Sequence, residues 1–151
     1  MEVSDLIIME NVFILTKNFI LQEFIPEDIF SDYGPTSIRF ISPKLPQIAQ
    51  GIKEYFNNST VTINDWFYDG AMQYRGFRPP DCEIGEELSA HKRGLAIDFN
   101  VKDFDDKEVQ KIIKANQTYF KAIGITLLKD DTYGYTHVSA EWTGIEELLV
   151  I

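Results

Sequence analysis

Two histidines and one aspartate are the residues of this sequence best suited to chemistry. The chain has only two histidines, His91 and His137, and Asp98 lies a few positions after the first of them. A neutral imidazole and an ionised carboxylate are good zinc ligands, and a catalytic zinc usually takes three protein ligands and leaves its fourth position to water. His91, Asp98 and His137 together would complete such a set.

The segment around Asp98 predicts how it is presented. Residues 96–101 alternate in character and predict a short strand, on which alternate side chains share a face. Asp98 would then face a cleft while Ile97 and Phe99 enter the core. Gly94 lies where the chain must turn into this strand, and glycine tolerates the dihedrals that such a turn needs. His91 would lie on a loop that folds back over Asp98. The alternative is a half-buried histidine and a strand-end acid without a metal.

Residues 135–139 predict a second strand, with His137 at its middle. By alternation, Tyr135 and Ser139 share a face with His137. Taken alone, such a histidine is more often a core or surface residue than a ligand.

The segment from Ser89 to Asp98 has the pattern S-x-H-x-x-G-x-A-x-D. It resembles the first zinc motif of the family of D-alanyl-D-alanine carboxypeptidases and L-alanyl-D-glutamate endopeptidases, whose fold the signalling domain of hedgehog proteins shares. The resemblance spans roughly residues 18–142. It implies an α+β fold with a small, mainly antiparallel sheet that carries the zinc ligands and helices packed on one face. It also implies Zn²⁺ as the cofactor, with His91, Asp98 and His137 as its ligands.

The resemblance also assigns residues that would contact substrate. Gly76-Phe77-Arg78 is similar to the S-G-Y-R element of the family, whose arginine can hold a carbonyl or carboxylate of the substrate. A guanidinium suits this role because it stays charged and binds oxygens bidentately. Arg78 could instead be a structural arginine paired with an acid. Ser89, Tyr135 and Gln73 are further candidates for contacts to substrate.

The general base is the part of the motif in which this chain departs from many family members. Many family members carry an acid three residues before the last histidine, where this chain has Gly134. Hedgehog-like members carry it six residues before, which corresponds to Asp131, and Asp130 is its neighbour. Peptide hydrolysis needs such a carboxylate to accept a proton and pass it to the leaving nitrogen. The alternative is that both are turn acids without a catalytic role.

The rest of the chain predicts a single domain over residues 1–151. Helices are expected over 18–24, capped by Asn18, over 42–56, and over 103–120, capped by Asp105 or Asp106 and ended by Gly124. Strands are expected over 12–16, 60–66 and 125–128, and residues 145–151 could be helix or strand.

Charge and composition restrict the partners. The formal net charge of −10 argues against binding of nucleic acid or of an anionic membrane surface. The single cysteine, Cys82, excludes an intrachain disulfide. The acidic amino terminus has no basic region and no cleavage site, so we expect synthesis in the cytoplasm without a signal peptide. No apolar run approaches a membrane span.

The predicted function is zinc-dependent hydrolysis of peptidoglycan stem peptides, of the D-Ala-D-Ala carboxypeptidase or L-Ala-D-Glu endopeptidase type. The expected setting is a phage lysis enzyme (an endolysin), a virion protein or a cytosolic recycling enzyme. Two alternatives remain open. One is a non-catalytic member of the fold that keeps the metal and acts as a phage structural or binding protein, and the other is a metal-free interaction domain.

Overall fold

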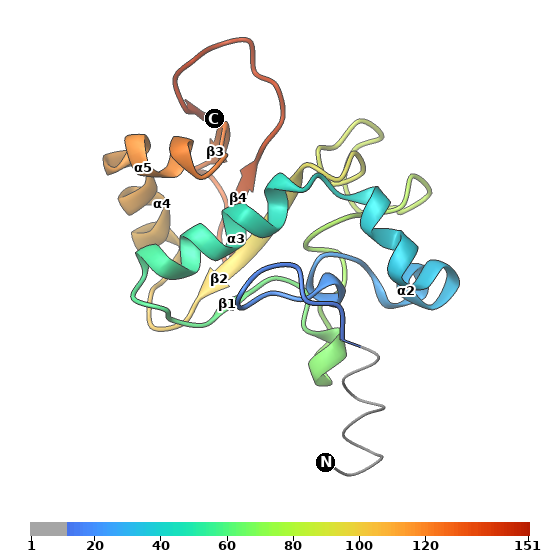
Figure 1. The fold of residues 1–151 in the computed structure, drawn as a ribbon. Coiled ribbons are helices and arrows are strands. Elements are labelled where there is room, and N and C mark those ends of the chain that lie inside the picture. The colour runs from blue at the N-terminus through green and yellow to red at the C-terminus, as the bar shows by residue number, and fades with distance from the viewer. Residues whose placement is uncertain (1–11) are drawn as a thin grey trace.

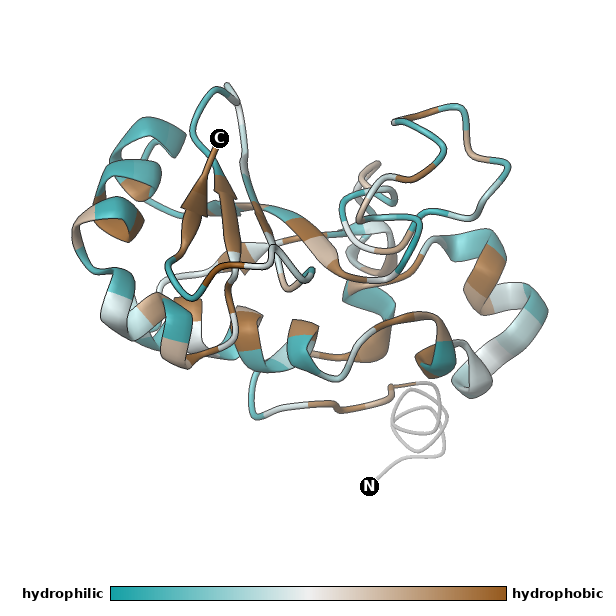
Figure 2. Ribbon diagram, turned by 90° about the horizontal axis from the view of Figure 1, so that it is seen from above, coloured by the Kyte–Doolittle hydropathy of each residue, from teal (hydrophilic) through white to brown (hydrophobic). Residues whose placement is uncertain are grey.

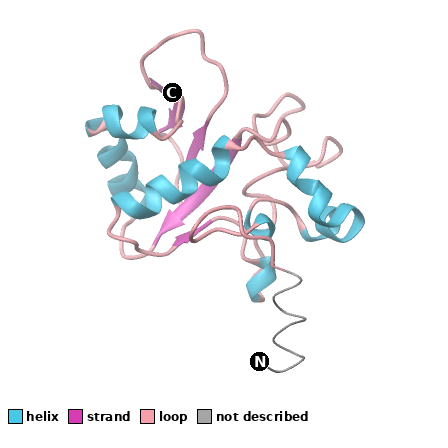
Figure 3. Ribbon diagram, in the orientation of Figure 1, coloured by secondary structure: helices cyan, strands magenta, loops and turns pink. Residues whose placement is uncertain are grey.

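A five-stranded mixed sheet forms the centre of the computed structural model, which describes residues 12–151 (Figures 1 and 3). The strands lie in the order β1-β2-β4-β3-β5. β1–β2, β2–β4 and β3–β4 are antiparallel pairs, and β3–β5 is parallel. The predicted α+β class is therefore confirmed. The strands are β1 (Val61–Thr62), β2 (Ala96–Val101), β3 (Leu127–Lys129), β4 (Thr136–Ser139) and β5 (Leu149–Val150).

Helices α3 (Lys44–Tyr55) and α4 (Asp106–Ala115) pack against the strands, and α2 (Glu27–Tyr33) lies beyond the edge of the sheet. A further α-helix is α5 (Gln117–Ala122), and the 3-10 helices are η1 (Leu21–Glu23), η2 (Gly34–Phe40) and η3 (Trp66–Tyr68). α3 contacts β1 and β2, α4 contacts β2 and β4, and α5 contacts both α3 and α4. Figure 1 shows α3 crossing in front of β2, with α4 and α5 beside it.

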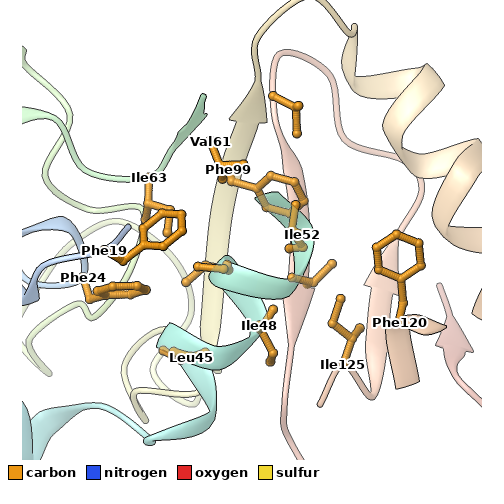
Figure 4. Packing of buried hydrophobic residues seen from close by; sticks show 14 of the residues in the cluster. Phe19, Phe24, Leu45, Ile48, Ile52, Val61, Ile63, Phe99, Phe120 and Ile125 are labelled. Carbon is orange, nitrogen blue, oxygen red and sulfur yellow. The ribbon is translucent and has the colours of Figure 1, made fainter. Parts of the chain in front are cut away.

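The core lies between α3 and the sheet. Leu45, Ile48 and Ile52 of α3 are fully buried, and Ile52 lies next to Phe99 of β2 (Figure 4). Their spacing is the apolar stripe that predicted this helix, and α3 confirms the expectation for residues 42–56. Burial of each such side chain contributes about 1.5–3 kcal/mol. Figure 2 shows hydrophobic and hydrophilic residues alternating along the helices, as expected of helices that bury one face.

The predicted helix over 103–120 is two helices. Asp105 caps α4 as predicted, since its carboxylate accepts a hydrogen bond of 2.9 Å from the Glu108 backbone N–H. α4 ends at Asn116, whose side chain donates to the Ile112 carbonyl at 2.8 Å and so turns the chain before α5. Gly124 follows α5 with a φ of +117°, as expected of a residue that ends a helix.

Three other predictions were wrong in part, and in two of them a side-chain hydrogen bond replaces the expected role of an asparagine. The expected strand over 12–16 is a single bridge between Ile14 and Ile20. The expected helix over 18–24 is only the short η1, and Asn18 does not cap it, since its side-chain oxygen accepts from Gln50 instead.

The expected strand over 60–66 shortens to β1. The Asn64 side chain donates to the Ile25 carbonyl and accepts from the Arg75 backbone N–H, which draws this residue out of the sheet. The segment 145–151 ends in strand β5, and the expected strand over 125–128 is β3, shifted toward Lys129.

Glu23 is a buried carboxyl group within η1. It accepts a hydrogen bond of 2.8 Å from the Ile20 backbone N–H and is 8% exposed. Burial raises the pKa of Glu23 to about 7, and the Ile20 hydrogen bond and Lys53 oppose this only in part. The protonated Glu23 stabilises the folded state fully at pH values below its unfolded pKa of 4.5. This stabilisation is lost as the pH rises through the folded pKa of about 7.

We therefore expect Glu23→Gln to stabilise the protein relative to wild type at pH 8 more than at pH 5, by at most about 3 kcal/mol. Urea unfolding at both pH values measures the difference. The exposed Glu54→Gln serves as the control and should show no such change. Equal effects of Glu23→Gln at the two pH values would contradict the assignment.

Candidate metal centre

Asp98 and His137 lie side by side on the face of the sheet opposite the core. β2 and β4 pair so that Asp98 is directly across from His137, and Ile97 across from Val138. Ile97 and Val138 are fully buried in the core, so Asp98 and His137 point to the other face. The Asp98 backbone N–H also donates to the Arg75 carbonyl at 2.7 Å, which holds β2 from its other edge. The predicted orientation of Asp98 is confirmed.

His91 comes from a long irregular segment, residues 69–95, that backbone contacts hold against the fold. The Phe77 N–H donates to the Phe24 carbonyl at 2.8 Å, and the Arg78 N–H donates to the His91 carbonyl at 3.1 Å. Gly94 has a φ of +68°, and a Cβ there would lie 1.9 Å from the Phe40 carbonyl oxygen. The turn therefore requires glycine, as expected, and it directs His91 over Asp98.

One atom of each predicted ligand converges on a single point. His91 Nε2 lies 3.1 Å from Asp98 Oδ1, His137 Nδ1 lies 2.8 Å from the same oxygen, and the two nitrogens lie 3.2 Å apart. All three residues are buried, and their donor atoms could together hold a metal ion. Ligands about 2.0–2.2 Å from a tetrahedral metal are separated by roughly 3.3–3.6 Å. A small outward movement of these side chains would therefore accommodate such an ion.

The hydrogen bonds around His91 explain why this group needs a cation. His91 Nδ1 lies 2.8 Å from the Gly76 carbonyl oxygen, which can only accept, so Nδ1 carries a proton. In a neutral imidazole the lone pair is then on Nε2, which faces the Asp98 carboxylate oxygen, another acceptor. Two acceptors at this distance repel each other unless a metal ion or an additional proton lies between them.

The protonation states also favour metal binding. Burial lowers the pKa of His137, and the hydrogen bond and negative charge of Asp98 offset this only in part. Burial alone would raise the pKa of Asp98, but its contacts with His137 and His91 outweigh burial and hold that pKa well below its usual range. A neutral imidazole and an ionised carboxylate are the forms that bind a metal.

Arg78 lies beside this group, in contact with Asp98. Its Nη2 donates to Asp98 Oδ2 at 3.2 Å, and its Nε donates to the Tyr74 carbonyl at 2.7 Å. The two charged side chains are only 11% and 7% exposed. Asp98 thus has one oxygen turned to Arg78 and the other to the histidines. This is the structural pairing with an acid that the sequence left as the alternative for Arg78, and it orients a predicted metal ligand.

An open pocket of about 620 Å³ lies over the three residues. The predicted residues Arg78, Ser89, Asp131 and Tyr135 line it together with the three candidate ligands. Gln73 is not among the residues that line the pocket. Its side-chain oxygen accepts from the Glu27 backbone N–H at 3.4 Å instead, so the structure does not bring Gln73 to the site.

Side chains of α4 hold the loop that carries Asp131. The buried Gln110 donates to both the carbonyl and the hydroxyl oxygen of Thr132, at 3.1 and 3.0 Å. Lys107 donates to the Asp130 carbonyl at 2.8 Å, and its ammonium lies 4.0 Å from the centre of the Tyr133 ring. These contacts fix an exposed loop that has no regular secondary structure of its own.

The two candidate bases have different surroundings. The Asp130 carboxylate pairs with Lys114 at 3.1 Å, and Asp130 does not line the pocket. Asp131 lines the pocket, and within residues 12–151 its carboxylate has no hydrogen-bond or ion-pair partner. Of the two acids, Asp131 is therefore the one available to a molecule in the pocket.

Lys129 and Glu141 are among the pocket residues that the sequence reasoning missed. Lys129 is directly across from His137, and it was missed because the predicted strand ended one residue too early. Glu141 accepts a hydrogen bond from Ser139 Oγ at 3.1 Å and pairs with Arg93. Continued alternation past Ser139 would have placed Glu141 on the face of His137.

Searches against protein-family models, curated proteins and solved structures found no match for this chain. The resemblance to the zinc peptidases therefore stays a prediction, and it depends on the motif residues. Among residues 12–151, none of the helices has the length and apolar character needed to cross a bilayer.

We expect the purified protein to bind one equivalent of a divalent ion such as Zn²⁺, and His91→Ala to lose it because one of three ligands is removed. Elemental analysis after gel filtration measures the bound metal. Lys92→Ala changes the neighbouring residue and should leave binding intact. Equal metal content in His91→Ala and wild type would exclude this site.

Arg78→Met should weaken metal affinity by about 10- to 100-fold, because an outer partner orients the ligating carboxylate. Competition with a chromogenic chelator measures the affinity. The exposed Arg39→Met should behave as wild type. Unchanged affinity in folded Arg78→Met would show that the contact with Asp98 does not support the metal site.

Proposed function

We propose that this protein is a zinc-dependent peptidase that hydrolyses stem peptides of bacterial peptidoglycan. The observation that carries the proposal is the convergence of His91 Nε2, Asp98 Oδ1 and His137 Nδ1 beneath an open pocket. A structural zinc site usually has four protein ligands, whereas three ligands facing a pocket leave a position for water. Zinc is proposed from the nitrogen and oxygen donors, which other divalent ions also accept.

The residues of the pocket suit the steps of peptide hydrolysis. A bound zinc ion would lower the pKa of its water and polarise the scissile carbonyl. The unpaired carboxylate of Asp131 would accept a proton from that water and pass it to the leaving nitrogen. Ser89 and Tyr135 would offer hydroxyl groups to the peptide. Arg78 would hold Asp98 in its ligating orientation.

The substrate class follows from the resemblance of Ser89, His91, Gly94, Ala96 and Asp98 to the family motif. The bond cleaved would be D-Ala-D-Ala or L-Ala-D-Glu, and the setting a phage lysis or virion protein or a recycling enzyme. This step is an analogy with the family rather than a consequence of the geometry.

A second candidate function is a non-catalytic, metal-binding phage structural or binding protein of the same fold. The observation that favours it is the exposure of Asp131, whose carboxylate forms no hydrogen bond or ion pair with the three candidate ligands. Gly134 also stands at the position where many family members carry their acid. Release of peptides from purified peptidoglycan, with and without a chelator, separates the two. Chelator-sensitive release supports the peptidase, and metal binding without release supports the second candidate.

Asp131→Asn should retain the metal and lose at least about 100-fold in hydrolysis, because general acid–base catalysis contributes about 10²–10⁴-fold. The rate of peptide release and the metal content are measured on the same preparation. Asp130→Asn changes the neighbouring acid, which pairs with Lys114 outside the pocket, and should stay within a few-fold of wild type. Full activity in Asp131→Asn would remove this residue from the mechanism.

A further inference from the structure

A row of three side chains crosses the sheet at the candidate metal centre. Asp98 of β2 is directly across from His137 of β4, and His137 is directly across from Lys129 of β3. Side chains paired in this way lie on the same face, with Cβ atoms about 5 Å apart. Lys129 also lines the pocket over the candidate ligands. The ammonium group is therefore held beside the metal ligands by the register of the sheet.

The ammonium of Lys129 is unpaired. Within the described residues 12–151 it has no hydrogen-bond or ion-pair partner. Arg78, the other lysine or arginine that lines the pocket, donates to Asp98 and to the Tyr74 carbonyl. Among the acids of the pocket, Asp98 is engaged by Arg78 and the histidines, and Glu141 is engaged by Arg93. The other two, Glu86 and Asp131, form no ion pair with Lys129 in the part of the chain that the structure describes. Lys129 is thus the cation that remains available to a ligand.

The position of this cation restricts what it can bind. A divalent ion bound by the three ligands would repel the Lys129 ammonium by like charge, and a negative group brought between them would relieve the repulsion. An ammonium offers three donors on a flexible stem, which suits a carboxylate. Lys129 is on the strand next to His137. A negative group bound by Lys129 must therefore lie close to the peptide bond that is held at the metal ligands.

We propose that Lys129 is a specificity-determining residue that binds a free carboxylate of the peptide substrate, within about one residue of the scissile bond. This inference rests on the proposed function and names its substrate class more closely. Peptides with a free carboxylate at this position are preferred over the same peptides with the carboxylate amidated.

The test compares two probes, N-acetyl-D-alanyl-D-alanine and its C-terminal amide. Their dissociation constants are measured by calorimetry or NMR on metal-free protein, where no hydrolysis occurs, and again on zinc-loaded Asp131→Asn. The wild-type sequence should bind the acid at least about tenfold more tightly than the amide, as expected for one charge-assisted hydrogen bond.

Variants at Lys129 identify the residue responsible. Lys129→Met and Lys129→Gln should bind the two probes equally, and Lys129→Arg should keep the preference for the acid. The exposed Lys121→Met on α5 is the matched control and should behave as wild type. Far-UV circular dichroism establishes that each variant is folded. Two neutral variants are used so that the test can still be made if one of them misfolds.

A preference for the acid that persists in folded Lys129→Met or Lys129→Gln overturns the inference, as does its absence in wild type. These outcomes are distinguishable from failure of the proposed function. Lys129-dependent binding of the acid without hydrolysis of peptidoglycan keeps this inference and removes the peptidase. Hydrolysis of peptidoglycan without any preference for the acid keeps the peptidase and removes the inference about Lys129.

Discussion

The structure depends on three potential ligand atoms, one each from His91, Asp98 and His137, that are held close to one point. The Gly76 carbonyl fixes the proton of His91 on Nδ1, so that its lone pair on Nε2 is directed at Asp98 Oδ1, and His137 Nδ1 meets the same oxygen. Two acceptors in contact repel each other unless a metal ion or a proton lies between them, and burial increases the cost. The surrounding fold supplies the compensation. Arg78 holds the second oxygen of Asp98, and the Arg75 carbonyl and β4 hold the two edges of β2.

The parts of the fold that could be predicted from the sequence are those governed by local periodicity. The apolar stripe of α3 and the alternation of β2 and β4 follow from which side chains are buried, so the helix, both strands and the facing of Asp98 and His137 were predictable. Elements decided by distant partners were not. Asn64 leaves its expected strand because it bonds to Ile25 and Arg75, and Asn116 divides a predicted helix in two.

The candidate site follows the same division. The metal ligands could be predicted because the motif fixes their types and the strands fix their directions. The environments of Arg78 and Lys129 could not, because they depend on how residues 69–95 fold back and on how β3 pairs with β4. The sequence indicated a positive charge beside the ligands, but only the tertiary contacts distinguish an arginine that is already engaged from a lysine that is available.

The third ligand comes from a distant segment of the chain, since His137 is 46 residues from His91 and 39 residues from Asp98. The unfolded chain therefore offers a metal ion His91 and Asp98, which are 7 residues apart, but not the complete set of three. Closing such loops costs entropy that only the assembled core repays, which makes the site a late product of folding. Metal ions would thus bind the native state selectively and slow unfolding more than they accelerate folding.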